Sequence, residues 1–175
     1  MFDAKKIFLF LILTKSASAS EASDWSNDVM PDNTWHKGFK PEFLYCKNKT
    51  NTDIEVYQQA IEYWKSKGRL EGISTEIRVT DCVNHPDDLG KIRLAGDEEI
   101  DEGYYGVTTR RLVEITTADG KVGKYVGSAY IRIEKKYAND LNMVIHELGH
   151  AIGMNHKHEK DSIMYRHHAD EETKL

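Results

Sequence analysis

The sequence predicts an α+β domain built on a twisted mixed sheet. Three features predict it: a strand–helix–strand pattern over residues 41–80, two long strands joined by a turn over residues 106–134, and an amphipathic helix after residue 140. Strands on either side of a helix run parallel, whereas strands joined by a tight turn run antiparallel, so the sheet has mixed direction. At 175 residues the chain suits one domain with a sizeable core.

The strand–helix–strand pattern occupies the first half of the chain. Residues 41–45 are typical of a short strand, and residues 73–80 of a second strand with alternating apolar positions. Between them, Thr52 and Glu55 have the spacing of a capping box, and Gly68 closes the predicted helix. Apolar residues at helical spacing indicate this helix, namely Ile54, Tyr57, Ile61 and Trp64.

The two cysteines of the chain, Cys46 and Cys82, follow these two strands. In a right-handed strand–helix–strand unit they lie just past the same ends of two parallel neighbours. A disulfide is then feasible, and closing this loop would stabilise the fold by roughly 4 kcal/mol in the chain-entropy model. The alternative is a pair of buried free thiols.

Further strands are predicted at residues 91–95 and 106–117. A turn at residues 118–120 then leads into a return segment up to residue 134, which contains a strong strand at residues 128–133. The acidic run at residues 97–102 precedes the long strand. Its carboxylates could bind calcium, but the run lacks the ligand spacing and the glycine of a calcium loop. We therefore interpret the run as a solvated loop, and calcium binding has no specific motif to support it.

The last predicted helix carries the residues most indicative of function. A residue at 139–140 can cap it, and one apolar stripe faces the sheet, made of Leu141, Ile145, Leu148 and Ile152. His146 and His150 are four residues apart, so they project together from another side of the helix and can hold one metal ion. Gly153 can take the left-handed conformation that ends a helix, after which the chain can bring His156 to the same ion.

Three histidine ligands leave one position of a tetrahedral zinc ion for water, which is the arrangement of a catalytic site. Glu147 lies next to His146 and is the candidate general base that takes a proton from this water. A purely structural zinc would not need Glu147. The alternative is a chance pattern on a helix whose histidines are satisfied by other contacts.

The segment from His146 to Tyr165 resembles the active site of the metzincin family of zinc endopeptidases. Residues 162–165, Ser-Ile-Met-Tyr, are similar to the methionine turn of that family, and their spacing from His156 is similar to that of the matrixin branch. Arg166 stands where astacins and serralysins carry a tyrosine that can bind zinc, which also favours matrixins. The resemblance implies a metzincin-like zincin catalytic domain, with a backing helix, an active-site helix and a methionine turn.

The resemblance also implies roles for residues outside the histidine segment. In metzincins an antiparallel strand at the edge of the sheet pairs with extended substrate, which places Gly106, Val107, Thr108 and Thr109 beside it. An exposed edge offers unpaired backbone groups to a peptide, although an ordinary edge strand is the alternative. Met164 is expected to form an apolar floor beneath the imidazoles. Tyr165 is expected either to line the pocket for the residue after the cleaved bond or to pack in the core.

The first residues of the chain indicate export. Residues 1–19 combine lysines, an apolar run and Ala-Ser-Ala, which is the pattern of a secretory signal peptide. The apolar run is too short to span a bilayer, and an uncleaved anchor is the alternative. We expect a secreted or extracytoplasmic protein in which residues 20–40 form an N-terminal arm or short propeptide, and residues 41–175 form the metalloprotease catalytic domain.

The charge of the chain argues against nucleic acid as a partner. Lys and Arg number 24 against 29 Asp and Glu, giving a net charge of −5, and the lysines are dispersed.

Taken together with the histidine motif and its resemblance, the sequence predicts a monomeric, exported zinc endopeptidase that cleaves extended polypeptide and holds one catalytic zinc ion. The alternatives are a zinc hydrolase of cell-wall peptide amides and a binding protein that holds the metal without turnover.

Overall fold

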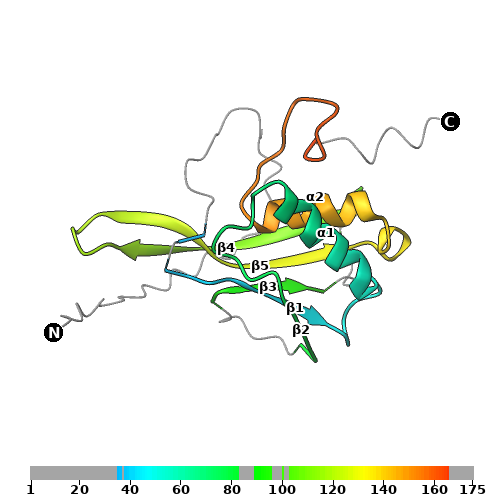
Figure 1. Ribbon diagram of the computed structural model, residues 1–175, viewed down its shortest axis with the longest axis horizontal. Coiled ribbons are helices and arrows are strands. Elements are labelled where there is room, and N and C mark those ends of the chain that lie inside the picture. Colours follow the sequence, from blue (N-terminus) through cyan, green and yellow to red (C-terminus); the bar gives the residue numbers. More distant parts are fainter. Residues whose placement is uncertain (1–34, 37, 83–88, 96–99, 101–102, 166–175) are drawn as a thin grey trace.

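The computed structural model describes residues 35–36, 38–82, 89–95, 100 and 103–165, and its sheet has five strands (Figure 1). The strand order is β2-β1-β3-β5-β4. The strands are β1 (Glu42–Cys46), β2 (Ile77–Thr80), β3 (Lys91–Leu94), β4 (Gly106–Thr116) and β5 (Val122–Ile133). All neighbours pair in parallel except β4, which runs antiparallel to β5 at the edge. The predicted α+β class and its mixed sheet are confirmed.

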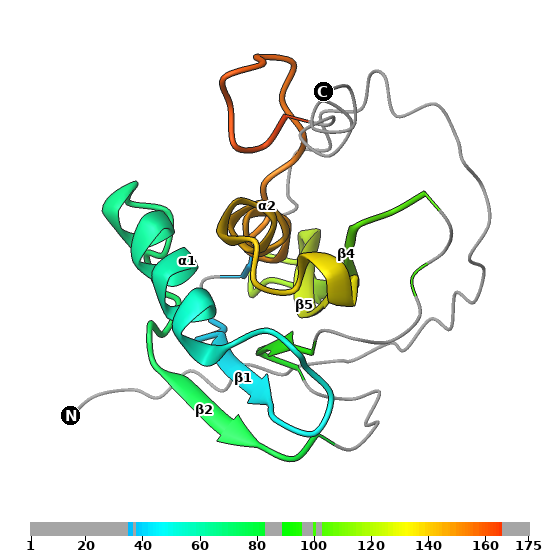
Figure 2. The ribbon, with the colours of Figure 1, turned by 90° about the vertical axis from the view of Figure 1, so that its right-hand side faces the viewer.

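Two helices cover the same face of this sheet (Figure 2). Helix α1 (Ile54–Ser66) connects β1 to β2, and α2 (Leu141–Ala151) follows the short 3₁₀ helix η1 (Lys135–Tyr137). The core lies between the helices and the sheet, and includes Phe43, Tyr57, Ile61, Trp64, Ile92, Leu94, Ile131, Ile133, Val144, Leu148 and Met164. The buried stripe of α2 is wider than predicted, because α2 packs against α1 as well as against the sheet.

The starts of the two helices are joined by side-chain hydrogen bonds. The predicted capping box at Thr52 is wrong: the N-cap of α1 is Asp53, and no side chain caps the helix there. Instead, the backbone N–H of Asp53 donates to Asn139 Oδ1 at 2.8 Å, and Asn139 Nδ2 donates to the Asp53 carboxylate at 3.0 Å. Asp140 caps α2 by accepting from two N–H groups of its first turn at 2.9 and 3.1 Å. Asn139 therefore anchors the start of the helix that carries the histidines.

One strand is shorter than predicted, and the return segment of the hairpin forms a single strand. The strand predicted at residues 73–80 covers only Ile77–Thr80, because the backbone N–H of Ser74 donates to the carbonyl of Pro41 before the chain reaches the sheet. The predicted return segment forms β5, which begins at Val122 and includes the strong strand pattern at residues 128–133. This strand is continuous because the ladder between β4 and β5 continues past a bulge at Arg111 and Leu112.

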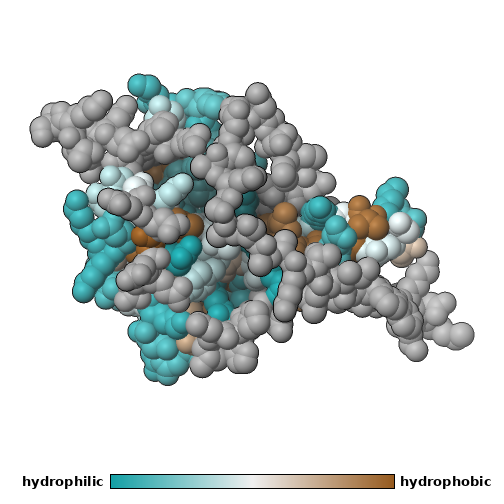
Figure 3. Space-filling view, turned by 180° about the vertical axis from the view of Figure 1, so that it is seen from behind, coloured by the Kyte–Doolittle hydropathy of each residue, from teal (hydrophilic) through white to brown (hydrophobic). Residues whose placement is uncertain are grey.

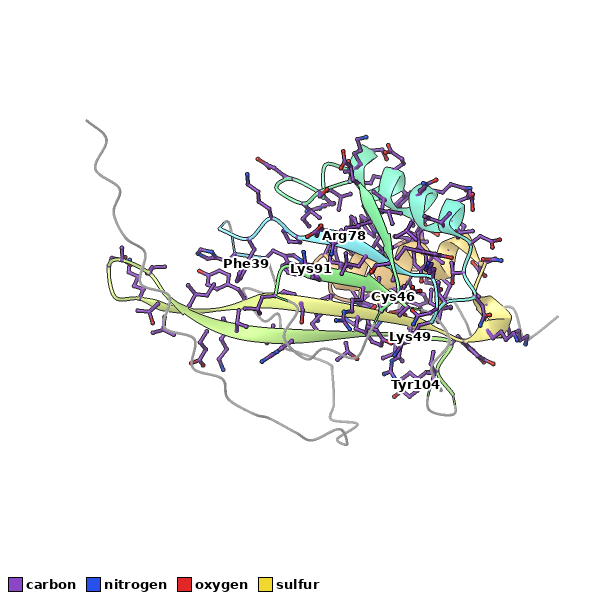
Figure 4. The ribbon with its side chains drawn as sticks, turned by 90° about the horizontal axis from the view of Figure 1, so that it is seen from below. Phe39, Cys46, Lys49, Arg78, Lys91 and Tyr104 are labelled. Carbon is purple, nitrogen blue, oxygen red and sulfur yellow. A yellow bond between two sulfur atoms is a disulfide. The ribbon has the colours of Figure 1, made fainter. Side chains whose placement is uncertain are left out.

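Beyond this bulge β4 and β5 project from the sheet as a two-stranded arm (Figure 1). The space-filling view shows apolar patches interleaved with polar ones along it (Figure 3). The base of the arm is braced by the first described residues: Trp35 forms a bridge with Val126, and the ring of His36 lies 4.8 Å from that of Tyr125. The ring of Phe39, labelled in Figure 4, lies 6.0 Å from that of His36 in an edge-to-face arrangement.

A disulfide joins Cys46 to Cys82 across the ends of two parallel strands, with a Cα–Cα distance of 5.0 Å. Asn48 reinforces this junction, because its amide accepts from the N–H of Cys82 at 2.9 Å and donates to the carbonyl of Cys82 at 3.2 Å. Among the described residues, the helices are too short or too polar to cross a membrane.

Candidate metal centre

The three histidines predicted as metal ligands lie together at the C-terminal end of α2. His146 and His150 project from the helix, and His156 comes from the segment that follows it. The Nε2 atoms of His146 and His150 are 3.1 Å apart, those of His150 and His156 are 3.1 Å apart, and those of His146 and His156 are 3.2 Å apart. The three nitrogens therefore surround one point.

The hydrogen bonds on the other side of two of these rings fix their tautomers. Nδ1 of His146 lies 2.7 Å from the carbonyl of Ile163, and Nδ1 of His150 lies 2.9 Å from the carbonyl of Met154. A carbonyl only accepts, so each Nδ1 carries the proton and each Nε2 directs a lone pair at the common point. Burial, followed by the neighbouring His146, lowers the pKa of His150 to about 3, which keeps its ring neutral.

This arrangement fits zinc. Neutral lone pairs that converge at 3.1 to 3.2 Å repel one another unless a cation lies between them. Nitrogens bound to a tetrahedral zinc ion at 2.0–2.1 Å would be about 3.3 Å apart, which is close to the observed spacing. The carbonyl contacts at Nδ1 are also the kind that orient histidine ligands in zinc sites.

A tight reversal after α2 brings His156 back to the helix. Gly153 has φ of 104°, which is a left-handed conformation that favours glycine, and its N–H donates to the carbonyl of His150 at 3.0 Å. The N–H of Met154 then donates to the carbonyl of Gly149 at 2.9 Å. The prediction that Gly153 ends the helix and reverses the chain is confirmed.

The turn at residues 162–165 supports the histidine cluster through its backbone carbonyls and through Met164. It is closed by the N–H of Tyr165, which donates to the carbonyl of Ser162 at 2.9 Å. The Ile163 carbonyl holds His146, while the Met164 carbonyl accepts from the N–H of the residue after His156 at 2.8 Å. Met164 itself is 1% exposed and packs against Gly149 of the helix. The turn thus holds the two chain segments that supply the histidines.

Glu147 is buried beside the cluster and touches the edge strand. It is 4% exposed, and its Oε2 lies 2.6 Å from the hydroxyl of Thr108 on β4. Gly106 lies directly against the carboxylate, since a Cβ on Gly106 would be 2.7 Å from Oε1. Burial raises the pKa of Glu147 to about 7, and the Thr108 hydrogen bond opposes part of this shift. A carboxyl group with a pKa near neutrality can both accept and donate a proton at neutral pH.

The segment predicted to bind substrate splits between two faces of the sheet. Gly106 and Thr108 pair with the core residues Ile133 and Ile131 and therefore face α2. Val107 and Thr109 alternate with them and face away. Since β4 is the last strand of the sheet, its outer edge pairs with no other strand in the described part of the chain. Tyr165 is half-buried next to the turn.

Two further residues near the site were not predicted. Arg110 lies on the same face of β4 as Thr108, and one of its buried guanidinium nitrogens has no hydrogen-bond partner. Strand alternation from Gly106 could have placed it there. The indole of Trp35 donates to the carbonyl of Ala151 at 3.0 Å and so fixes the end of α2. No local sequence pattern indicates a contact between residues that are so far apart in the chain.

The acidic run at residues 97–102, considered above for calcium, lies outside the described residues except for Ile100. Among the described residues, the three histidines form a group of metal-binding side chains close enough together to hold one ion.

Comparison with known proteins agrees with the resemblance seen in the sequence. The family model described as matrixin, a family of peptidases, matches residues 29–175. No curated protein and no solved structure matches the chain. The family match covers the sheet, both helices, the histidine cluster and the turn, and it indicates a zinc metallopeptidase. The chain belongs to the matrixin family.

Proposed function

We propose that this protein is an exported zinc endopeptidase that cleaves extended polypeptide with Glu147 as its general base. The observation that carries the proposal is the convergence of three histidine Nε2 atoms beside a buried carboxylate. Three ligands leave a coordination position open, and the adjacent base has no purpose in a structural site. His146, His150 and His156 are the proposed ligands of the one zinc ion.

The proposed reaction divides the chemistry between the ion and Glu147. When bound, zinc supplies Lewis acidity that polarises the scissile carbonyl and acidifies a water molecule. Glu147 accepts a proton from that water as it attacks, and it later returns the proton to the leaving amine. No serine or cysteine nucleophile is required. Met164 contributes an apolar floor under the imidazoles, which its burial against Gly149 supports.

The proposed substrate lies along the outer edge of β4. Residues 106–109 offer backbone groups at this edge, immediately beside the carboxylate of Glu147. Backbone pairing holds an extended peptide without requiring a particular sequence, so it suits an endopeptidase. Tyr165, next to the methionine turn, is proposed to line the pocket for the residue after the cleaved bond.

We propose that the protein is exported, on the grounds of its first residues and its disulfide. Residues 1–19 have the pattern of a signal peptide, and the disulfide between Cys46 and Cys82 is stable in an oxidising compartment. Residues 20–40 would then be an arm or a short propeptide before a catalytic domain at residues 41–175. We propose that the exported protein acts as a monomer.

The proposal is tested by cleavage of an unstructured polypeptide by the zinc-loaded exported protein, beside Glu147→Gln at matched zinc content. Glutamine keeps the shape of glutamate but cannot accept the proton, so we expect the rate to fall by about 10²–10⁴-fold. Equal cleavage by both proteins would show that Glu147 is not the base.

The same measurement separates the alternative functions. Cleavage of cross-linked cell-wall peptides but not of the unstructured polypeptide would favour the amide hydrolase. No cleavage of either substrate by the fully loaded parent would favour the binding protein without turnover.

A further inference from the structure

Thr108 is the polar side chain that contacts the carboxylate of Glu147 in the described part of the chain. Its Oγ1 lies 2.6 Å from Oε2 and 2.8 Å from the backbone carbonyl of Glu147. We propose that Thr108 is a positioning residue for the general base, with Gly106 as the bare backbone that admits the carboxylate. This inference rests on the proposed function, because it assigns a role to Thr108 through Glu147.

The length of the contact indicates which acceptor the hydroxyl uses. A threonine hydroxyl has one proton to donate. A separation of 2.6 Å is typical of an O–H group that donates to an ionised carboxylate, while the 2.8 Å contact is typical of a neutral acceptor. When the Glu147 carboxylate is ionised, the Thr108 hydroxyl therefore donates to its Oε2. That leaves Oε1 as the oxygen that can accept from a water molecule.

The sheet fixes the direction of this hydroxyl. Thr108 pairs with Ile131 of β5, and Gly106 pairs with Ile133. Both isoleucines are 0% exposed and belong to the core under the helices, so a slip of β4 by one residue would turn Thr108 away from α2. The register of β4 therefore sets the position of the donor relative to the helix that carries Glu147.

Gly106 contributes by the absence of a side chain. A Cβ at this position would lie 2.7 Å from Oε1, 2.8 Å from Cγ and 3.0 Å from Cδ of Glu147. These distances are well inside van der Waals contact, so any side chain would displace the carboxylate from its place. Thr108 and Gly106 both lie on β4, and together they hold Glu147. Thr108 contacts its Oε2, and Gly106 lies against its Oε1, Cγ and Cδ.

The consequence concerns turnover rather than metal binding. His146 and His150 are oriented by the carbonyls of Ile163 and Met154, and His156 follows the reversal after α2, so none of these supports belongs to β4. Removing the Thr108 hydroxyl should therefore leave the zinc ligands in place and release only the base. A base that is free to rotate is aligned less often, which lowers kcat and leaves substrate binding nearly unchanged.

The test compares Thr108→Val with Thr108→Ser, and with Thr116→Val as the matched control. Valine removes the hydroxyl and keeps the shape, serine restores the hydroxyl, and Thr116 is an exposed residue near the far end of the same strand. For Thr108→Val we expect kcat to fall about 10- to 100-fold with KM within about twofold, at unchanged zinc content. Thr108→Ser and Thr116→Val should keep kcat within about threefold of the parent.

A crystal structure of zinc-loaded Thr108→Val provides a readout that does not depend on turnover. We expect the Glu147 carboxylate to leave its position over Gly106 or to occupy more than one rotamer. An unmoved carboxylate, or a kcat equal to that of the parent, would overturn the proposal. If the parent itself cleaves nothing, the proposed function fails, and the position of the carboxylate in the crystal still decides the role of Thr108.

Discussion

Gly149 lies where α2 meets both α1 and the methionine turn, and Gly149→Ala tests how tightly this contact is built. A Cβ at this position would overlap Sδ of Met164 and would lie 2.7 Å from Cζ2 of Trp64. Neither neighbour can retreat easily. Trp64 is held by its indole N–H, which donates to the carbonyl of Ile145 at 2.8 Å, and Met164 is 1% exposed within a turn that also holds His146.

The expected change in the free energy of unfolding of Gly149→Ala is the balance of two effects. Alanine is the better helix former, which would stabilise α2 by about 1 kcal/mol. Extra volume in a filled core costs about 1–3 kcal/mol, and the short distances place this site at the upper end of that range. We therefore expect a net loss of about 1–2 kcal/mol in the free energy of unfolding, together with weaker zinc binding because the turn behind His146 must move.

Urea unfolding of the metal-free protein measures the first effect, and competition with a chelator measures the second. A double-mutant cycle identifies the cause. If the contact with Met164 is responsible, Gly149→Ala with Met164→Ala should be more stable than the sum of the two single losses by about 1 kcal/mol or more. Strict additivity, or a Gly149→Ala protein more stable than the parent, would refute the reasoning.

Three further predictions concern other parts of the molecule. Replacing Cys46 and Cys82 by serine should lower the free energy of unfolding by about 4 kcal/mol, because the disulfide spans 36 residues; unchanged urea unfolding would contradict this. His150→Ala and His156→Ala should each lose bound zinc on dialysis, and metal analysis showing full zinc would disprove the ligand assignment. Burial raises the pKa of Tyr57 to about 12, so its contribution to stability is complete below pH 10 and is lost as the pH rises towards 12. Between pH 9 and pH 11 the parent should lose about 1.4 kcal/mol more than Tyr57→Phe in urea unfolding, and equal losses would count against the assigned pKa.

The metal site could be predicted from the sequence because its parts are close together in the chain. The spacing of His146 and His150 follows from helical geometry alone, and Gly153 permits the reversal that brings back His156. Local rules are therefore sufficient to predict that the three imidazole rings converge. The turn that holds them follows within a few residues, at Ile163 and Met164.

The contacts that support this site from elsewhere could not be predicted. Thr108 meets Glu147 across 39 positions, Asn139 meets Asp53 across 86, and Trp35 meets Ala151 across 116. Each contact depends on how the helices lie on the sheet, which no local pattern specifies. The capping box at Thr52 failed for the same reason, because a distant asparagine bonds to the N-cap residue instead.

The strand pattern of the return segment is weaker along the arm than at residues 128–133, for a different physical reason. Strand patterns indicate burial on one face, but the arm of β4 and β5 beyond the bulge leaves the sheet, and Leu112 and Val122 are 42% and 63% exposed. Its pairing is maintained by the hairpin itself and by Trp35 and His36 at its base. Because burial on one face produces the alternating pattern, that pattern is strong only over residues 128–133 of the return segment.

These two kinds of contact divide the site into parts that should fail separately. The proposed zinc ligands depend on α2, the reversal at Gly153 and the turn, all within residues 141–165. The proposed base depends on β4, which reaches Glu147 only once the whole sheet has formed in the correct register. Damage to the edge strand should therefore give a protein that retains zinc and has lost turnover, while damage to the turn should lose both. Within a single chain, zinc retention then reports on the helix and its turn, and turnover reports on the sheet.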